Sequence, residues 1–219
     1  MNKLLIQTSD ESVQALCKKD PILKKLINVI GDIEINLRKD YFKSLIRSII
    51  GQQISVAAAS TIYERFEALF EGEMTSQKLL AISEADLRAV GLTKRKAEYV
   101  KDLATKVSES ELDLENMAKY SNEEIMKQLT NVKGIGKWTA EMFLILTLGR
   151  EDILAIDDVG IQRAAKWLYE VDTSKRRDIL VEKSDLWKPN RSIVSFYLWE
   201  ALHLDFVAKY NSIDDINRG

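Results

Sequence analysis

Two adjacent carboxylates, Asp157 and Asp158, stand directly before an apolar run whose spacing predicts a helix from residue 159 onward. A carboxylate at such a position caps the helix by accepting a hydrogen bond from a backbone N–H group. The positive end of the helix dipole also stabilises its negative charge, and a fixed anion can stabilise a cation that forms during a reaction. From the residues alone, a plain helix cap and a catalytic carboxylate explain the pair equally well.

A second group of chemistry-bearing residues lies upstream, around a Gly-X-Gly turn. Gly134 and Gly136 let the backbone pass close to a partner, and the helix predicted to begin at Lys137 leaves its first N–H groups without intrahelical acceptors. Such a helix start suits an anion, and Lys133 and Lys137 add two positive charges beside it. We interpret residues 131–137 as a clamp for a nucleic-acid backbone, with a simple tight turn between two helices as the alternative.

The elements that must position these groups are helices. Apolar residues recur at spacings of three and four along most of the chain and on both sides of the glycine turn, so residues 124–148 predict a helix, a hairpin and a helix. Residues 4–7 are the exception and predict a short extended piece. With 219 residues, 46% of them hydrophobic, and two prolines, the chain can bury a substantial core in one body or two lobes. We predict an all-α fold.

These motifs carry a resemblance to a known family. The helix-hairpin-helix segment resembles that of the HhH-GPD superfamily of DNA base-excision glycosylases. Three further segments resemble signatures of that family in the expected order, and together they cover most of the chain: SIIGQQIS (48–55), AVGLTKRKAEYV (89–100) and WKPNRSIVSFYLW (187–199). Within the family, the chain resembles the 3-methyladenine DNA glycosylase II branch, in a compact form without the extra N-terminal domain of larger bacterial members.

The resemblance implies two helical lobes with a cleft between them. Residues 37–156 would form a central helical domain that carries the helix-hairpin-helix. Residues 1–36 and 157–219 would together form a discontinuous second domain.

The resemblance assigns catalysis to the second aspartate of the pair, Asp158. The implied reaction is hydrolysis of the N-glycosidic bond between an alkylated purine and deoxyribose, with Asp158 facing an oxocarbenium-like sugar. A unit charge pair at about 4 Å in an effective dielectric near 20 contributes roughly 4 kcal/mol, on the order of a thousandfold in rate. Whether the carboxylate also activates the attacking water stays open.

Aromatic residues are expected to select the base. Trp138 stands where bifunctional relatives carry a Schiff-base lysine, so the resemblance implies a monofunctional enzyme without AP-lyase activity. Trp138 and Trp199 would line the base pocket, where indole faces attract a cationic purine by about 0.5 to 2 kcal/mol, with Met142 on the same wall. Core packing is the alternative for each tryptophan. Met142 and Val159 replace aromatic residues of larger relatives, which leaves the base preference open.

The resemblance also implies that the enzyme rotates the damaged base out of the duplex and fills the gap that remains. Gln53 matches the intercalating position of the family and is our predicted plug. Between Arg88 and Lys106, six basic residues stand against two acidic ones, which predicts a second edge facing the phosphates. The predicted contacts to the DNA backbone are Gly134, Gly136, Lys137, Thr139, Lys94 and Arg95.

Some classes of site are excluded by what the sequence lacks. Cys17 is the single cysteine, so an iron-sulfur cluster, which needs four thiolates, is excluded, and no Cys/His set for zinc is present. We predict no cofactor and no catalytic metal. Family hairpins bind a monovalent cation through backbone carbonyls, and the resemblance places it here at Thr130, Val132 and Gly134.

The net charge of −2 argues against nucleic-acid binding unless the basic residues are segregated on one face. The first residues lack a signal-peptide pattern, and no apolar run is long enough to span a bilayer. We expect a monomeric cytoplasmic protein, associated with the nucleoid, whose partner is double-stranded DNA containing alkylated bases.

Two alternatives stay open at this stage. One is a helix-hairpin-helix module that binds DNA and catalyses nothing. The other keeps the glycosylase fold but acts on oxidised or deaminated bases.

Overall fold

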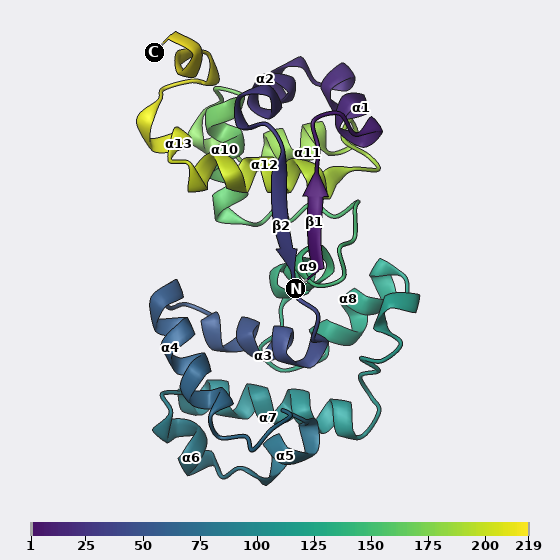
Figure 1. Ribbon diagram of the computed structural model, residues 1–219, viewed down its shortest axis with the longest axis vertical. Coiled ribbons are helices and arrows are strands. Elements are labelled where there is room, and N and C mark those ends of the chain that lie inside the picture. Colours follow the sequence, from purple (N-terminus) through teal and green to yellow (C-terminus); the bar gives the residue numbers. More distant parts are fainter. Residues whose placement is uncertain (1, 219) are drawn as a thin grey trace. The chain divides into compact units, whose positions relative to one another are not determined.

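The computed structural model describes residues 2–218 and divides into two compact units (Figure 1). Unit 1 comprises Met1–Leu37 and Gly149–Gly219, and unit 2 comprises Arg38–Leu148. Residues 149–156 were expected in the central domain, whereas they pack within unit 1.

Unit 1 combines a small antiparallel sheet with helices from both ends of the chain. Strands β1 and β2 lie side by side (Figure 1), with Leu4 opposite Ile35 and Ile6 opposite Ile33. Helix α12 packs against α2 and α10, and α1 packs against α2. The elements are β1 Asn2–Ile6, α1 Glu11–Lys19, α2 Pro21–Ile30, β2 Ile33–Leu37, α10 Val159–Leu168, α11 Asp178–Ser184, α12 Arg191–His203 and α13 Phe206–Lys209, with 3-10 turns at Thr173–Lys175 and Ile213–Arg218.

A buried carboxylate joins distant segments of unit 1. Asp20 is the N-cap of α2 and accepts hydrogen bonds from the backbone N–H groups of the first turn. Its Oδ2 accepts from Tyr169 Oη at 2.6 Å and from Trp187 Nε1 at 3.0 Å. Burial, with the carboxylate of Asp20 next in importance, raises the pKa of the Tyr169 hydroxyl. These bonds connect the start of α2 to the end of α10 and to the segment before α12.

The segment 149–156 is fastened to the start of α12. Arg191 forms a two-pronged ion pair with Asp152, with Nε–Oδ1 at 2.7 Å and Nη2–Oδ2 at 3.0 Å. Ser192 Oγ donates to the carbonyl of Arg150 at 2.6 Å and accepts from the backbone N–H of Ile153 at 3.1 Å. These contacts explain why residues 149–156 belong to unit 1.

The regular secondary structure in the described residues of unit 2 is helical. Its core consists of apolar side chains that α3, α7, α8 and α9 bury against one another, among them Ile49, Leu103, Leu129 and Phe143. Side-chain caps fix several helix starts, including a capping box between Ser121 and Glu124 on α8. The elements are α3 Tyr41–Gly51, α4 Val56–Glu67, α5 Ser76–Ala81, α6 Glu84–Ala89, α7 Lys94–Ser108, a 3-10 turn Met117–Lys119, α8 Asn122–Thr130 and α9 Lys137–Leu146.

The predicted helical class is confirmed, with a short sheet added to it. The extended piece expected at residues 4–7 is found as β1, whereas β2 was not anticipated. Within residues 2–218, none of the helices combines the length and the apolar character that a bilayer crossing requires.

Candidate active site

Asp158 is the N-cap of α10. Its Oδ1 accepts a hydrogen bond from the backbone N–H of Ile161 at 2.7 Å, and the Trp199 indole Nε1 lies 3.4 Å from the same oxygen. The side chain of Asp158 is half-buried. The carboxylate therefore caps a helix and also lies in a partly exposed position beside an indole.

The neighbouring carboxylate has a different environment. Asp157 is exposed, and its Oδ1 pairs with Arg177 Nε at 2.9 Å. The two aspartates of the pair thus have different partners: Asp157 pairs with Arg177, whereas Asp158 contacts the start of α10 and the Trp199 indole.

Gly160 permits the close packing around Asp158. A Cβ atom at this position would lie 3.0 Å from Asp158 Oδ1, 3.2 Å from Leu202 Cδ1 and 3.9 Å from Trp199 Cδ1. The first two distances are shorter than ordinary van der Waals contact, so a side chain would displace the carboxylate or its neighbours. Sequence reasoning missed this residue, because nothing in its type separates it from the glycines of ordinary turns.

Trp199 lies on helix α12, next to a run of buried residues, 192–198. Trp199 is half-buried and packs beside Phe196, with ring centroids 6.0 Å apart. Tyr197, two residues earlier, is fully buried, and its hydroxyl donates to the carbonyl of Gly31 at 3.0 Å. Burial raises the pKa of Tyr197 to about 12. Trp199 thus differs from its buried neighbours on the same helix in reaching a polar, partly exposed group.

The remaining predicted site residues belong to unit 2, beginning with the hairpin. Gly136 is the N-cap of α9, and no side chain caps this helix start. Gly134 has a φ of +82°, and an added Cβ would lie 2.1 Å from Cδ2 of Tyr99. A glycine is therefore required at position 134 both by its left-handed backbone and by the aromatic ring packed against it.

The first residues of α9 differ in exposure. Trp138 is 45% exposed, which disagrees with simple core packing for this tryptophan. Lys137 is exposed and forms an ion pair with Glu141 at 3.6 Å. Met142 is buried, and Thr139 is only 5% exposed. The Thr139 side chain offers almost no surface to a phosphate, so the predicted hydroxyl contact is disfavoured by burial.

Gln53 lies in a short exposed loop, residues 52–55, that we call the plug loop. Gln53 is exposed and has a φ of +58°, in the left-handed region that few residues other than glycine adopt. Ser55 caps α4 by accepting from the backbone N–H of Ala58 at 3.2 Å. Next to the loop, the apolar side chain of Val56 is 89% exposed.

The basic edge between residues 88 and 106 is only partly available to phosphates. Lys94 is exposed, and Arg95 Nε donates to Tyr99 Oη at 2.7 Å. The ammonium groups of Lys96 and Lys101 instead donate to backbone carbonyls of other helices. Lys94 and Arg95 stay predicted backbone contacts, whereas Lys96 and Lys101 have structural partners.

Metal binding has little support from side chains. Among the described residues, no three His, Cys, Asp or Glu side chains form a group that could hold a metal ion. Of the carbonyls implied for a monovalent cation, that of Gly134 accepts from the Gln52 side chain at 2.7 Å, and that of Val132 accepts from the Ile135 N–H at 3.0 Å. Two of the three carbonyl oxygens of Thr130, Val132 and Gly134 thus already accept hydrogen bonds. The monovalent cation stays a prediction.

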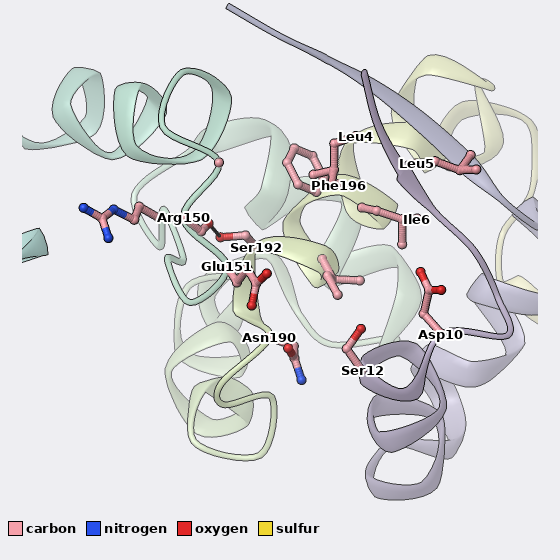
Figure 2. Close-up of a pocket in the computed structure, with 12 residues that line it drawn as sticks. Leu4, Leu5, Ile6, Asp10, Ser12, Arg150, Glu151, Asn190, Ser192 and Phe196 are labelled. Atoms are coloured by element: carbon pink, nitrogen blue, oxygen red, sulfur yellow. Dashed lines mark hydrogen bonds between the residues drawn. The ribbon is translucent and has the colours of Figure 1, made fainter. Parts of the chain in front are cut away.

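Unit 1 also contains a pocket of about 150 Å³, and neither Asp158 nor Trp199 lines it. Figure 2 shows its lining residues, which come from β1, the start of α1, the segment 149–151 and the start of α12. None of the predicted site residues lines this pocket.

Residues 46–189 match the family model described as "HhH-GPD superfamily base excision DNA repair protein". The DNA-3-methyladenine glycosylase 1 of Schizosaccharomyces pombe is 28% identical over 212 residues, covering 91% of this chain and 93% of that protein.

Two solved structures are similar over almost the whole chain. The DNA-3-methyladenine glycosidase of Bacillus halodurans has a TM-score of 0.89 and 33% identity, covering 99% of this chain and 100% of that one. The Schizosaccharomyces pombe 3-methyladenine DNA glycosylase in complex with abasic DNA has a TM-score of 0.77 and 28% identity, covering 92% of this chain and 99% of that one. The helix-hairpin-helix spans residues 122–146 and is followed by a carboxylate, Asp158, that caps helix α10. The chain belongs to the HhH-GPD superfamily of base excision DNA repair proteins.

Proposed function

We propose that this protein is a DNA glycosylase of base excision repair that hydrolyses the N-glycosidic bond of alkylated purines in duplex DNA. The observation that carries the proposal is the placement of Asp158, whose Oδ1 is held by the Ile161 N–H at 2.7 Å with the Trp199 indole at 3.4 Å. The names of the similar proteins, and the abasic DNA bound to one of them, support the same reaction class.

The chemistry follows from the charge of the damaged base. Alkylation at a ring nitrogen makes the purine cationic, so the electron pair of the breaking C1′–N bond neutralises the departing base. The sugar becomes an oxocarbenium-like cation, which the carboxylate of Asp158 stabilises. A water oxygen then bonds to C1′ and loses a proton, and the products are a free base and an abasic sugar. The reaction therefore needs one fixed carboxylate and no strong general acid.

We propose that the enzyme is monofunctional and has no AP-lyase activity. Trp138 occupies the position at which bifunctional members of the family carry the amine nucleophile, and its exposed indole cannot form a Schiff base. Lys137 is the adjacent amine, and its ammonium pairs with Glu141 at 3.6 Å. Water is then the nucleophile.

The indoles are proposed to select cationic bases. Trp199 approaches Asp158 directly. Trp138 and Met142 are proposed as further contacts to the flipped base. A cation over an indole face is stabilised by roughly 0.5 to 2 kcal/mol, which favours alkylated purines over neutral damaged bases. The hairpin, Lys94 and Arg95 are proposed to contact the backbone, Gln53 to replace the flipped base, and the protein to act as a cytoplasmic monomer.

The test is a panel of duplexes that each carry one alkylated, deaminated or oxidised base. Excess protein is added, and free base and alkali-labile sites are measured. We expect release of alkylated purines and strand cleavage only after alkali treatment. Release of none of the bases, with duplex binding retained, would support a non-catalytic DNA-binding module. Strand cleavage without alkali would refute the monofunctional mechanism, and exclusive release of oxidised or deaminated bases would refute the substrate class.

A further inference from the structure

The plug loop is held by hydrogen bonds from two other parts of unit 2. Lys96 Nζ donates to the carbonyl oxygens of Ile50 at 2.7 Å and Gln52 at 2.8 Å, at the carboxyl end of α3. The side-chain Nε2 of Gln52 donates to the carbonyl of Gly134 in the hairpin at 2.7 Å. The loop that presents Gln53 is thereby connected to α7 and to the hairpin at the same time.

One face of α7 contacts both of these elements. Lys96, Tyr99 and Asp102 follow one another at a spacing of three residues, which places them on one side of a helix. Lys96 holds the plug loop, and the ring of Tyr99 packs against Gly134. Asp102 Oδ2 accepts from the backbone N–H of Lys133 at 2.9 Å. Helix α7 is therefore a rigid spacer between the plug loop and the hairpin.

The charge of Lys96 suits this position. The last carbonyl groups of a helix carry partial negative charge and lack intrahelical donors, and an ammonium group can satisfy both needs. Lys96 is half-buried, and burial lowers its pKa. Its own backbone N–H is fixed by Thr93 Oγ1 at 3.2 Å, which caps α7 at the same turn. The side chain is thus anchored at its base and at its tip.

The plug loop needs such anchoring because its conformation is strained. Gln53 has a φ of +58°, and a left-handed residue other than glycine persists only where the surrounding structure enforces it. Lys96 binds the carbonyl of Gln52, which belongs to the peptide that leads into Gln53. Without the ammonium group, that peptide loses the hydrogen bond to its carbonyl oxygen, and Gln53 can relax to an ordinary backbone conformation.

We propose that Lys96 is a positioning residue for base flipping, which sets where Gln53 enters the base stack relative to the phosphate held by the hairpin. The proposal rests on the proposed function, since it concerns the same reaction. It predicts that Lys96 affects the extraction of a paired base more than the cleavage of a base that is already unpaired.

The chain offers a matched control on the same helix. Lys101 Nζ also caps a helix end, donating to the carbonyls of Leu79 and Leu80 at 2.8 Å each and to that of Ile82. Those carbonyls belong to the end of α5, away from the plug loop. Lys96→Met and Lys101→Met remove the same chemical group from the same kind of contact, so both are expected to lower the melting temperature. Only Lys96→Met should affect flipping.

The experiment measures single-turnover base release from two substrates that carry the same alkylated purine, one paired in a duplex and one in a bulge. Relative to the Lys101→Met variant, Lys96→Met should release the paired base about ten to a hundred times more slowly, since small displacements of positioning groups cost rates of this order. The loss should be much smaller for the bulged base. Lys96→Arg, which keeps the charge and its donors, should recover part of the rate.

A second measurement separates this proposal from the function on which it rests. Amide hydrogen exchange in residues 52–55 should be faster in Lys96→Met than in the wild type or Lys101→Met. Equal exchange in the three proteins would overturn the proposal whatever the substrate. Equal losses on paired and bulged substrates would also overturn it. If the wild type releases no base, the proposed function fails, and exchange alone still decides whether Lys96 holds the loop.

Discussion

Two helix starts in this protein use the same physics in opposite ways. Helix α10 in unit 1 begins with Asp158, so its N-terminus is capped by a negative side chain of the protein itself. Helix α9 in unit 2 begins with Gly136, where no side chain acts as a cap and Lys137 adds a positive charge. Both ends have positive dipoles. One end holds an internal anion in place, and the other suits an anion supplied by a partner.

Under the proposed function, the start of α10 serves the chemical step, whereas the start of α9 serves DNA binding. A carboxylate that caps its helix is fixed in position, which is what a group facing a transient cation requires. A glycine start exposes backbone rather than a side chain, which is what a close approach to a phosphate requires. Substitutions at the two helix starts should therefore impair different steps, base release at α10 and duplex binding at α9.

The largest effect is expected at the capped end. Asp158→Asn keeps a side chain that caps helices well but removes the negative charge. We expect base release to fall by about a thousandfold, the value of a charge pair worth roughly 4 kcal/mol, with little change in duplex binding. The matched control is Asp157→Asn, which removes the exposed carboxylate that pairs with Arg177. Single-turnover release and fluorescence anisotropy measure the two quantities. Equal losses in both variants would contradict the assignment of catalysis to Asp158.

An intermediate effect is expected two residues further along α10. Gly160→Ala places a methyl group 3.0 Å from the Asp158 carboxylate and should slow base release about ten to a hundredfold by displacing it. Alanine normally stabilises a helix relative to glycine by roughly 0.5 to 1 kcal/mol, and this gain should be lost to crowding at position 160. Gly51→Ala, where the new Cβ meets Ala59 Cβ at an ordinary 3.8 Å, should raise the melting temperature instead. An unchanged rate of base release by Gly160→Ala would contradict the prediction that the rate depends on the position of the Asp158 carboxylate.

The smallest effect is expected at the glycine end. Lys137→Gln should weaken duplex binding equally for damaged and undamaged DNA and reduce the slope of log affinity against log salt by about 0.9. Lys209→Gln in α13 is a close control. The Lys209 side chain is 62% exposed and pairs with Asp205 at 3.7 Å, and the Lys137 side chain is 61% exposed and pairs with Glu141 at 3.6 Å. Titrations at several salt concentrations measure both slopes. The same slope in both variants would argue against a phosphate contact at the hairpin.

The parts of this molecule that sequence could predict are those set by local interactions. Asp158 as a helix cap follows from its position before an apolar run, and the turn around Gly134 and Gly136 follows from the Gly-X-Gly pattern between two helical segments. The second strand was missed although residues 33–37 alternate between apolar and polar side chains. Five residues give a weak signal by themselves, and the strand is stabilised by pairing with β1, about 30 residues earlier in sequence.

The rest depends on backbone groups that have no signature in the sequence. Lys96 and Lys101 were read as part of a phosphate-facing run, because a sequence shows charges but not the carbonyls that satisfy them. Their partners lie 44 to 46 residues away for Lys96 and 19 to 22 for Lys101. The family resemblance assigned Trp199 and Asp158 to the same site, but their contact across 41 residues was not predicted, and Gly160 was missed.

The fork between Arg191 and Asp152 joins the segment that leads to Asp158 to the helix that bears Trp199. Orientational freedom of the carboxylate against the indole is therefore lost when unit 1 folds, before any nucleotide arrives. The Asp158 carboxylate therefore needs no rearrangement against the indole when DNA binds. The free energy of DNA binding can instead offset the cost of unstacking the damaged base.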